Sequence, residues 1–184
     1  MGTWWMPTCG WRIIRSMTNG LTYTRKTTST EATKQLASTL APYLHAGDVI
    51  VLSGDLGAGK TQFVQGVAAR LGVRDQVTSP TFNILLQYPG GSLPLYHFDL
   101  YRLEDSDELE DIGYYETIDG DGVSFVEWGE KFPQSLPCGY LEVSITVDED
   151  DNRHVCAQSF GDRARQLLFL WAKDSKSRLM KTAG

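Results

Sequence analysis

One stretch of eight residues limits the folds open to this chain more than any other feature. Residues 54–61 read GDLGAGKT, which matches the pattern G-x-x-x-x-G-K-T. A short, continuous apolar run at residues 49–52 precedes the stretch, and an amphipathic segment from Thr61 to Leu71 follows it and ends at Gly72. A buried strand, a glycine loop and a helix in this order predict a nucleotide-binding α/β fold.

The residues of this loop suit phosphate. Glycines let consecutive backbone N–H groups turn toward phosphate oxygens, and the helix that follows adds the positive end of its dipole. We expect Lys60 to reach the β- and γ-phosphates and the Thr61 hydroxyl to bind a bridging Mg²⁺. The predicted nucleotide-binding residues of the P-loop are Gly54, Asp55, Leu56, Gly57, Ala58, Gly59, Lys60 and Thr61.

Two carboxylates end predicted apolar strands, where parallel-sheet proteins gather their sites. Asp99 follows Tyr96-His97-Phe98, and Glu127 follows Phe125-Val126. Each is a candidate to bind Mg²⁺, directly or through water, or to polarise an attacking water. The alternative is that each is an exposed carboxylate or a helix cap. His97 is either a packed residue or part of the site, and Trp128 belongs either to the core or to the closure of the site.

A segment after the first nucleotide-binding helix reads Ser79-Pro80-Thr81-Phe82 and is referred to below as the switch-like loop (residues 79–82). Many nucleotide switches carry a γ-phosphate sensor at this place. The hydroxyls of Ser79 and Thr81 are candidate sensors. The alternative is that Pro80 simply shapes a turn.

The remaining pattern predicts one domain over residues 21–172, a three-layer P-loop NTPase-like sandwich with a mixed, mostly parallel sheet between helices. Residues 1–20 form a dispensable N-terminal extension in this interpretation, and residues 173–184 a basic C-terminal tail. The expected elements are helices over 30–44, 61–71 and 105–112, and strands over 49–52, 82–88, 95–101, 124–128, 141–147 and 167–171.

Composition narrows the class of protein further. No run approaches 18 consecutive apolar residues, so we expect no membrane span. The net charge is -6, and residues 99–151 hold most of the acids and only two bases, Arg102 and Lys131. These acids are interpreted as solvated loops and helix faces, or as a partner-docking surface. Three cysteines without metal-ligand spacing favour a reducing cytoplasm.

Five motifs occur in order between residues 29 and 147: GDLGAGKT at 54–61, SPTF at 79–82, YHFDLYRL at 96–103, DELEDIG at 107–113 and VEWGEK at 126–131. Together they resemble the bacterial TsaE (YjeE) family of ATPases. The resemblance implies a Mg²⁺-dependent ATPase that binds the TsaB and TsaD proteins in a nucleotide-dependent way. This complex forms the threonylcarbamoyl group on adenosine 37 of tRNAs that read ANN codons, and tRNA is contacted through the complex.

The resemblance also implies roles for individual residues. Lys60 and Thr61 would hold phosphates and Mg²⁺, Glu127 would be the metal-associated carboxylate, and Asp99 would be a catalytic or metal-orienting acid. Trp128 would lie at the active face, and Thr30 would neighbour the adenine.

Two other functions share the P-loop. A small-molecule kinase would use the same Lys60 and Thr61, but it normally needs an arginine-bearing lid, and only Arg102 lies in the central region. The other is a nucleotide-binding partner protein without useful turnover.

Overall fold

The structure, a computed structural model, describes residues 21–182 and shows seven strands in one sheet within that range. The strands are β1 (Thr22–Thr27), β2 (Val49–Ser53), β3 (Leu85–Tyr88), β4 (Leu95–Asp99), β5 (Val123–Glu127), β6 (Tyr140–Val147) and β7 (Arg153–Phe160). The helices are α1 (Thr30–Ser38), α2 (Lys60–Leu71), α3 (Glu108–Asp111), α4 (Tyr114–Ile118) and α5 (Gly161–Thr182), with short 3-10 turns η1 (Ala41–Tyr43) and η2 (Gly129–Lys131).

The sheet has a parallel centre and antiparallel edges. Its strand order is β1-β7-β6-β2-β5-β4-β3. Strands β6, β2, β5 and β4 pair in parallel, whereas β3, β7 and β1 are antiparallel to their neighbours. The predicted mixed sheet with a parallel core is therefore confirmed, and the carboxyl ends of β2, β4 and β5 meet at one edge.

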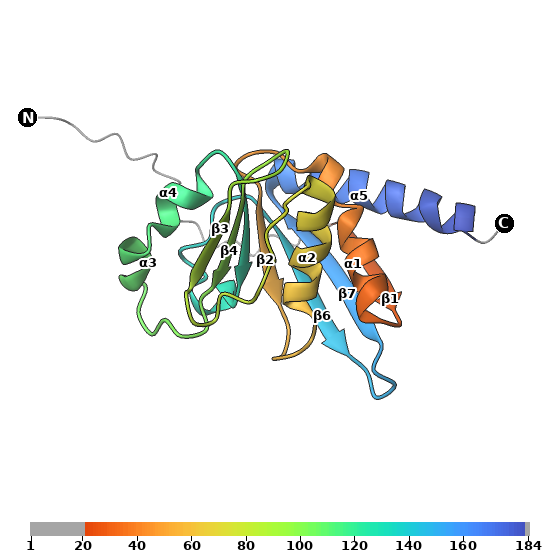
Figure 1. Cartoon of the computed structure of the whole chain (residues 1–184), viewed down its shortest axis with the longest axis horizontal. Coiled ribbons are helices and arrows are strands. Elements are labelled where there is room, and N and C mark those ends of the chain that lie inside the picture. The colour runs from red at the N-terminus through yellow and green to blue at the C-terminus, as the bar shows by residue number, and fades with distance from the viewer. Residues whose placement is uncertain (1–20, 183–184) are drawn as a thin grey trace, which may run out of the picture.

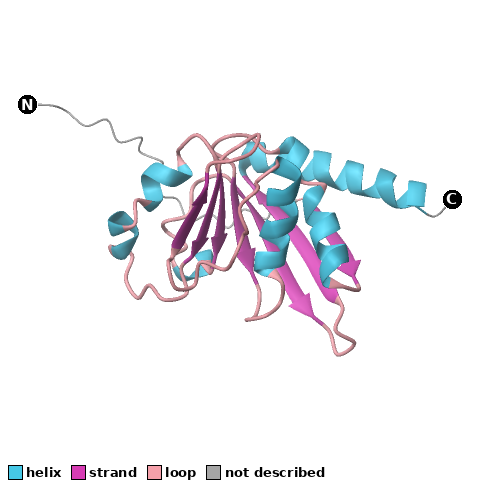
Figure 2. Ribbon diagram, viewed as in Figure 1, coloured by secondary structure: helices cyan, strands magenta, loops and turns pink. Residues whose placement is uncertain are grey.

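Helices cover both faces of this sheet (Figures 1 and 2). Strand β2 is central and is apolar from Val49 to Leu52, so its alternate residues enter two separate cores. Ile50 and Leu52 pack with α1, α2 and α5, and Val49 and Val51 pack with α3 and α4. This is the expected three-layer arrangement. The position of a residue along a central strand therefore decides which of the two cores its side chain enters.

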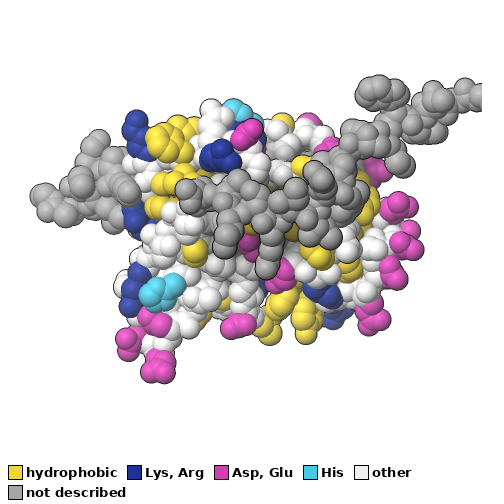
Figure 3. Space-filling view, turned by 180° about the vertical axis from the view of Figure 1, so that it is seen from behind, with side chains coloured by type: hydrophobic (Ala, Val, Ile, Leu, Met, Phe, Trp, Pro, Cys, Tyr) yellow, Lys and Arg dark blue, Asp and Glu magenta, His cyan; other side chains and the backbone are white. Residues whose placement is uncertain are grey.

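Part of the acidic middle of the chain, the segment that carries α3 and α4, lies at one end of the molecule. Exposed acids line the segment that carries α3 and α4, and they include Asp105, Asp107, Glu110, Asp111 and Glu116. Figure 3, viewed from behind, shows acidic side chains clustered at that end. Leu109, Tyr114 and Ile118 face inward, so the acids occupy the outer faces of these short helices.

The expected strand over residues 167–171 is wrong, because these residues lie inside α5. The run LLFLW looks like a buried strand, but burial follows a helical spacing: Ala164, Leu167, Leu168 and Trp171 are buried, and Phe169 is 58% exposed. Helix α5 also continues through residues that the sequence suggested as a separate tail. The proposed extension over residues 1–20 lies outside the described residues.

Other element boundaries differ for local reasons. Helix α1 ends at Ser38, and the chain continues into the 3-10 turn η1, because Pro42 cannot continue an α-helix. Strand β3 begins at Leu85 rather than Phe82, since Ile84 adopts a left-handed backbone with φ of 65°. Strands β1 and β7 are absent from the expected elements, because their alternating polar residues carry a weak apolar signal.

Within the described range, no helix combines the length and hydrophobicity that crossing a membrane requires.

Trp171 joins α5 to the rest of the fold, and its replacement should be costly. Its ring lies 4.9 Å from that of Tyr23 and 5.9 Å from that of Phe63, and its indole N–H donates to Thr39 at 2.8 Å. We predict that Trp171→Ala lowers the free energy of unfolding by about 3–5 kcal/mol, measured by urea denaturation. Phe169→Ala is the matched control on the exposed face of α5, and equal losses in the two variants would contradict this packing.

Candidate functional site

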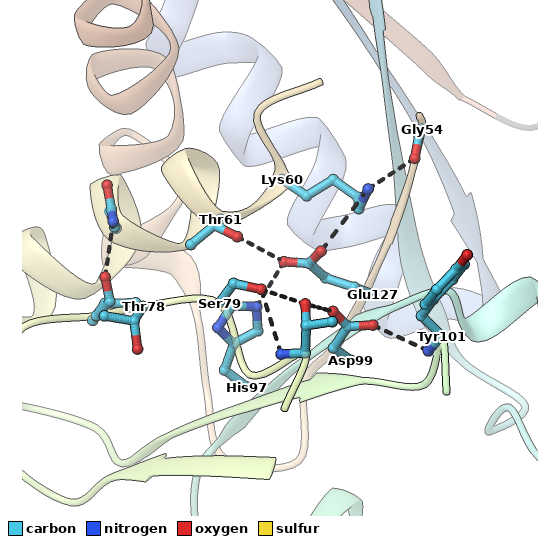
Figure 4. A network of polar contacts seen from close by, with 12 residues as sticks. Gly54, Lys60, Thr61, Thr78, Ser79, His97, Asp99, Tyr101 and Glu127 are labelled. Atoms are coloured by element: carbon cyan, nitrogen blue, oxygen red, sulfur yellow. Dashed lines mark hydrogen bonds and ion pairs between the residues drawn. The ribbon is translucent and has the colours of Figure 1, made fainter. Parts of the chain in front are cut away.

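The candidate site lies where β2, β4 and β5 end. The P-loop connects β2 to α2, which begins at Lys60. Leu52 pairs with Glu127 across β2 and β5, and Asp99 pairs with Glu127 across β4 and β5. The side-chain alternation that points Leu95 and Phe125 into the core beneath α2 also directs His97, Asp99 and Glu127 toward that layer. The sheet therefore brings both predicted carboxylates beside the P-loop (Figure 4).

Backbone geometry explains the glycines of the P-loop. Gly54 has a φ of 136°, and a Cβ placed there would lie 2.2 Å from the carbonyl oxygen of Ile145 on β6. Gly57 and Gly59 also have positive φ, of 82° and 114°. Leu56, at the tip of the loop, is 90% exposed. The loop is thus pressed against the neighbouring strand at one end and open to ligand at its tip.

The ammonium group of Lys60 is held at the mouth of this loop. It donates to the carbonyl oxygens of Gly54 at 2.8 Å and Asp55 at 3.1 Å. It also lies 3.9 Å from Oε2 of Glu127 and 4.8 Å from the centre of the Trp128 ring. A buried cation surrounded by oxygen atoms and an aromatic face is placed to meet a phosphate that enters the loop.

Glu127 is the carboxylate that faces the P-loop. Its Oε1 accepts hydrogen bonds from the Thr61 hydroxyl at 3.2 Å and from Nε2 of His97 at 2.9 Å. With Lys60 near Oε2, three side chains from α2 and β4 converge on this one group (Figure 4). Glu127 is only 4% exposed, so these contacts replace the water that its charge would otherwise keep.

Asp99 contacts the switch-like loop instead. Its Oδ2 accepts a hydrogen bond from the Thr81 hydroxyl, and its Oδ1 accepts one from the backbone N–H of Tyr101 at 3.0 Å. The hydroxyls of Ser79 and Thr81 lie 2.7 Å apart. The two carboxylates, whose roles the sequence leaves undivided, thus contact different parts of the site.

The chain turns sharply at the end of the switch-like loop. The backbone N–H groups of Asn83 and Ile84 both donate to the carbonyl oxygen of Pro80, at 2.8 and 2.6 Å. The left-handed backbone of Ile84 is costly for a β-branched residue, and it persists because both of its backbone groups are bonded. Phe82 is 80% exposed, with the guanidinium of Arg102 4.6 Å from the ring centre.

Two other predicted site residues are Trp128, which contacts the site, and Thr30, which does not form a hydrogen bond with it among the described residues. Trp128 follows β5 with a φ of 62°, which brings its ring over Lys60 and 5.1 Å from the ring of Tyr101. Thr30 begins α1, which packs along α2 so closely that a Cβ on Gly66 would lie 2.2 Å from the carbonyl oxygen of Lys34. In the part of the chain that the structure describes, no hydrogen bond joins Thr30 to the groups above.

Sequence reasoning left open whether His97 is a packed residue or part of the site, and it gave Lys131 no role. Lys131 donates to the carbonyl oxygens of Tyr101 and Leu103 at 2.6 and 2.5 Å and so holds the segment after β4. The signal for His97 was its place two residues before Asp99, on the same side of one strand. No sequence signal pointed to the Lys131 bonds. Their acceptors are backbone carbonyl oxygens, which every residue has, so no residue type marks the partners.

The side chains present fit Mg²⁺. Thr61 and Glu127 offer oxygen atoms, which this ion prefers, and Asp99 lies on the adjacent strand. Among the described residues, no group of three or more His, Cys, Asp or Glu side chains could hold a metal. Magnesium sites at nucleotides usually combine one or two carboxylates with phosphate oxygens.

The bond from Thr81 to Asp99 should hold the switch-like loop on the sheet. We predict that Thr81→Val increases the hydrogen-exchange rates of the Asn83 and Ile84 amides by about tenfold, since one charge-assisted bond contributes roughly 1.5–3 kcal/mol. Thr146→Val, at an exposed position on β6, is the control. Exchange rates at residues 83–84 that match those of the control would show that this bond does not fix the loop.

Comparisons with known proteins agree with the motifs. The family model described as threonylcarbamoyl adenosine biosynthesis protein TsaE matches residues 27–155. A protein from Bacillus subtilis (strain 168), named tRNA threonylcarbamoyladenosine biosynthesis protein TsaE, is 44% identical over 142 residues, which are 77% of this chain and 89% of the relative. A protein of the same name from Treponema pallidum (strain Nichols) is 42% identical over 127 residues, which are 69% of this chain and 93% of the relative.

A solved structure matches as well. The crystal structure of Bacillus subtilis YdiB superposes with a TM-score of 0.73 at 35% sequence identity, and the match covers 85% of this chain and 97% of that chain. The residues matched by the family model include the P-loop, Asp99 and Glu127, and the chain belongs to the TsaE family.

Proposed function

We propose that this protein is a Mg²⁺-dependent ATPase of the cytoplasm that serves the formation of the threonylcarbamoyl group on adenosine 37 of ANN-decoding tRNAs. It acts by nucleotide-dependent binding to the TsaB–TsaD complex and reaches tRNA through that complex. The observation that carries the proposal is the convergence of Lys60 and Thr61 of the P-loop on the buried Glu127. The printed names of the relatives support the place in tRNA modification.

Nucleotide binding falls to the P-loop in this proposal. The ammonium of Lys60 exchanges its bonds to the Gly54 and Asp55 carbonyls for bonds to the β- and γ-phosphates of ATP. Backbone N–H groups of the loop and the first turn of α2 add further donors for the phosphate oxygens. Exposed Leu56 at the loop tip leaves the approach from solvent open.

The metal in this proposal is held by Thr61 and Glu127, with Asp99 as a further oxygen donor. When bound, Mg²⁺ neutralises charge that develops on the phosphates during hydrolysis. The Thr61 hydroxyl, which donates to Glu127, would be one of the groups that hold the ion. The Trp128 ring covers one side of Lys60 and keeps water away from that side.

The switch-like loop couples nucleotide state to partner binding in this proposal. The Ser79 hydroxyl is bonded to that of Thr81, and Thr81 is bonded to Asp99, so a γ-phosphate that recruits either hydroxyl alters the support of the whole loop. Phe82 lies on the same loop, and Arg102 lies on the segment after β4; both side chains are exposed. Exposed aromatic and arginine side chains are frequent anchors in protein interfaces, so this surface is suited to report the change to a partner.

Removing the P-loop lysine should weaken nucleotide binding. We predict that Lys60→Ala raises the Kd for ATP by about 10–100-fold, because a charged hydrogen bond contributes roughly 1.5–3 kcal/mol. Isothermal titration calorimetry measures this change. Lys34→Ala on α1 is the control, and an unchanged ATP affinity in Lys60→Ala would refute the P-loop assignment.

Replacing the metal-associated carboxylate should affect turnover more than binding. We predict that Glu127→Gln lowers the rate of ATP hydrolysis by about 10²-fold, as expected when one group that stabilises the transition state is lost, and changes ATP affinity much less. Steady-state phosphate release and calorimetry give the two values. Hydrolysis at the wild-type rate would remove Glu127 from the site.

The role in the complex has a direct test. The purified chain is mixed with the TsaB–TsaD pair in the presence of ATP, ADP or no nucleotide and passed over a size-exclusion column. We expect co-elution that depends on the nucleotide. Complex formation that is independent of the nucleotide would contradict the proposal and favour a nucleotide-binding partner protein without useful turnover. A phosphorylated metabolite formed from ATP would contradict it and favour a kinase.

A further inference from the structure

His97 makes a contact that the proposed function does not require for binding nucleotide. It lies on β4 with its side chain fully buried, and it contacts neither the P-loop nor the switch-like loop through any hydrogen bond of the described residues. Its polar partner is Oε1 of Glu127, at 2.9 Å from Nε2. Both side chains are almost completely removed from solvent, at 0% and 5% exposure.

The protonation pattern of this pair follows from its partners. A carboxylate oxygen only accepts hydrogen bonds, so Nε2 of His97 carries the hydrogen and donates it. The other ring nitrogen, Nδ1, is buried and has no hydrogen-bond partner among the described residues. The hydrogen bond to Glu127 therefore places a hydrogen on Nε2, whereas a hydrogen on Nδ1 would be a buried donor without an acceptor.

A buried histidine with one unpaired ring nitrogen lowers the stability of the fold, so its contact with Glu127 calls for an explanation. An unpaired buried ring nitrogen costs stability, and an apolar side chain of similar size would avoid that cost. Leu95, two residues earlier on the same face of β4, shows that this face accommodates an apolar side chain at full burial. What the histidine adds over such a residue is one donor aimed at the carboxylate.

We propose that His97 is a positioning residue that orients Glu127 for Mg²⁺ at the P-loop. Oε1 accepts from both Thr61 and His97, and this leaves Oε2 directed toward Lys60 and the loop mouth. With the Thr61 hydroxyl engaged by the metal, His97 would be the group that still donates to Oε1. The inference rests on the proposed function, since it assigns Glu127 to the metal.

Two substitutions separate orientation from packing. His97→Phe removes the donor and keeps a planar ring, whereas His97→Gln keeps an N–H donor at about the place of Nε2. Outer-shell partners of metal ligands typically contribute 10–100-fold in metal affinity or activity. We expect the Mg²⁺ concentration that half-saturates ATP hydrolysis to rise by about tenfold in His97→Phe and to return toward the wild-type value in His97→Gln.

A second measurement does not depend on turnover. Calorimetry of ATP binding with EDTA should give the wild-type affinity in both variants, whereas the increase in affinity on adding Mg²⁺ should be smaller in His97→Phe. Phe98→Leu is the matched control, because this neighbouring position packs in the opposite core, next to Tyr114. It lowers stability without touching Glu127, so its Mg²⁺ dependence should equal that of the wild type.

The outcomes distinguish this inference from the function beneath it. A His97→Phe protein with wild-type Mg²⁺ dependence, made from a wild type that binds and hydrolyses ATP, overturns the positioning role alone. A wild type that neither binds nor hydrolyses ATP contradicts the proposed function and this inference together. Should His97→Phe fail to fold, His97→Asn, whose shorter side chain does not reach Glu127, takes its place against His97→Gln, and equal Mg²⁺ dependence of these two variants overturns the role.

Discussion

The candidate site depends on one buried charge. Glu127 ends a strand in the middle of the sheet, where it is nearly inaccessible to water, and an ionised carboxylate in such a place is stable only when other groups solvate it. Lys60 and Thr61 come from α2, and His97 comes from β4. The carboxylate thus links the nucleotide loop to the sheet, and the positions of these side chains cannot be altered independently.

The parallel centre of the sheet explains why this arrangement forms. Because β2, β5 and β4 run in the same direction, their carboxyl ends bring the P-loop, Glu127 and Asp99 to one edge. Asp99 then lies next to Glu127 but points its bonds at Thr81 and Tyr101. Glu127 contacts the P-loop, which is proposed to hold the phosphates, and Asp99 contacts the switch-like loop, which is proposed to sense them. Paired residues of two adjacent strands therefore contact the two loops.

Much of this could be read from the sequence, and the failures have physical causes. The P-loop was predictable because its glycines, Lys60 and Thr61 follow one another along the chain, between a buried strand and a helix. The different contacts of Asp99 and Glu127 were not, since they depend on which loop crosses each strand end. The run at residues 167–171 was misassigned to a strand because all five of its residues are apolar. The residues themselves do not show that the run is helical and that Phe169 faces solvent, since the fold decides which positions are buried. Strands β1, at the edge of the sheet, and β7, next to it, escaped prediction because half of each faces away from the core.

The central claim is that the P-loop and Glu127 together hold a magnesium-bound triphosphate. A crystal structure of the protein with Mg²⁺ and a non-hydrolysable ATP analogue tests this most directly. The account predicts the γ-phosphate beside the Lys60 ammonium, and the metal within bonding distance of the Thr61 hydroxyl, with Glu127 directed at it. A triphosphate bound elsewhere on the protein, or a Glu127 side chain turned away from the metal, would contradict the account.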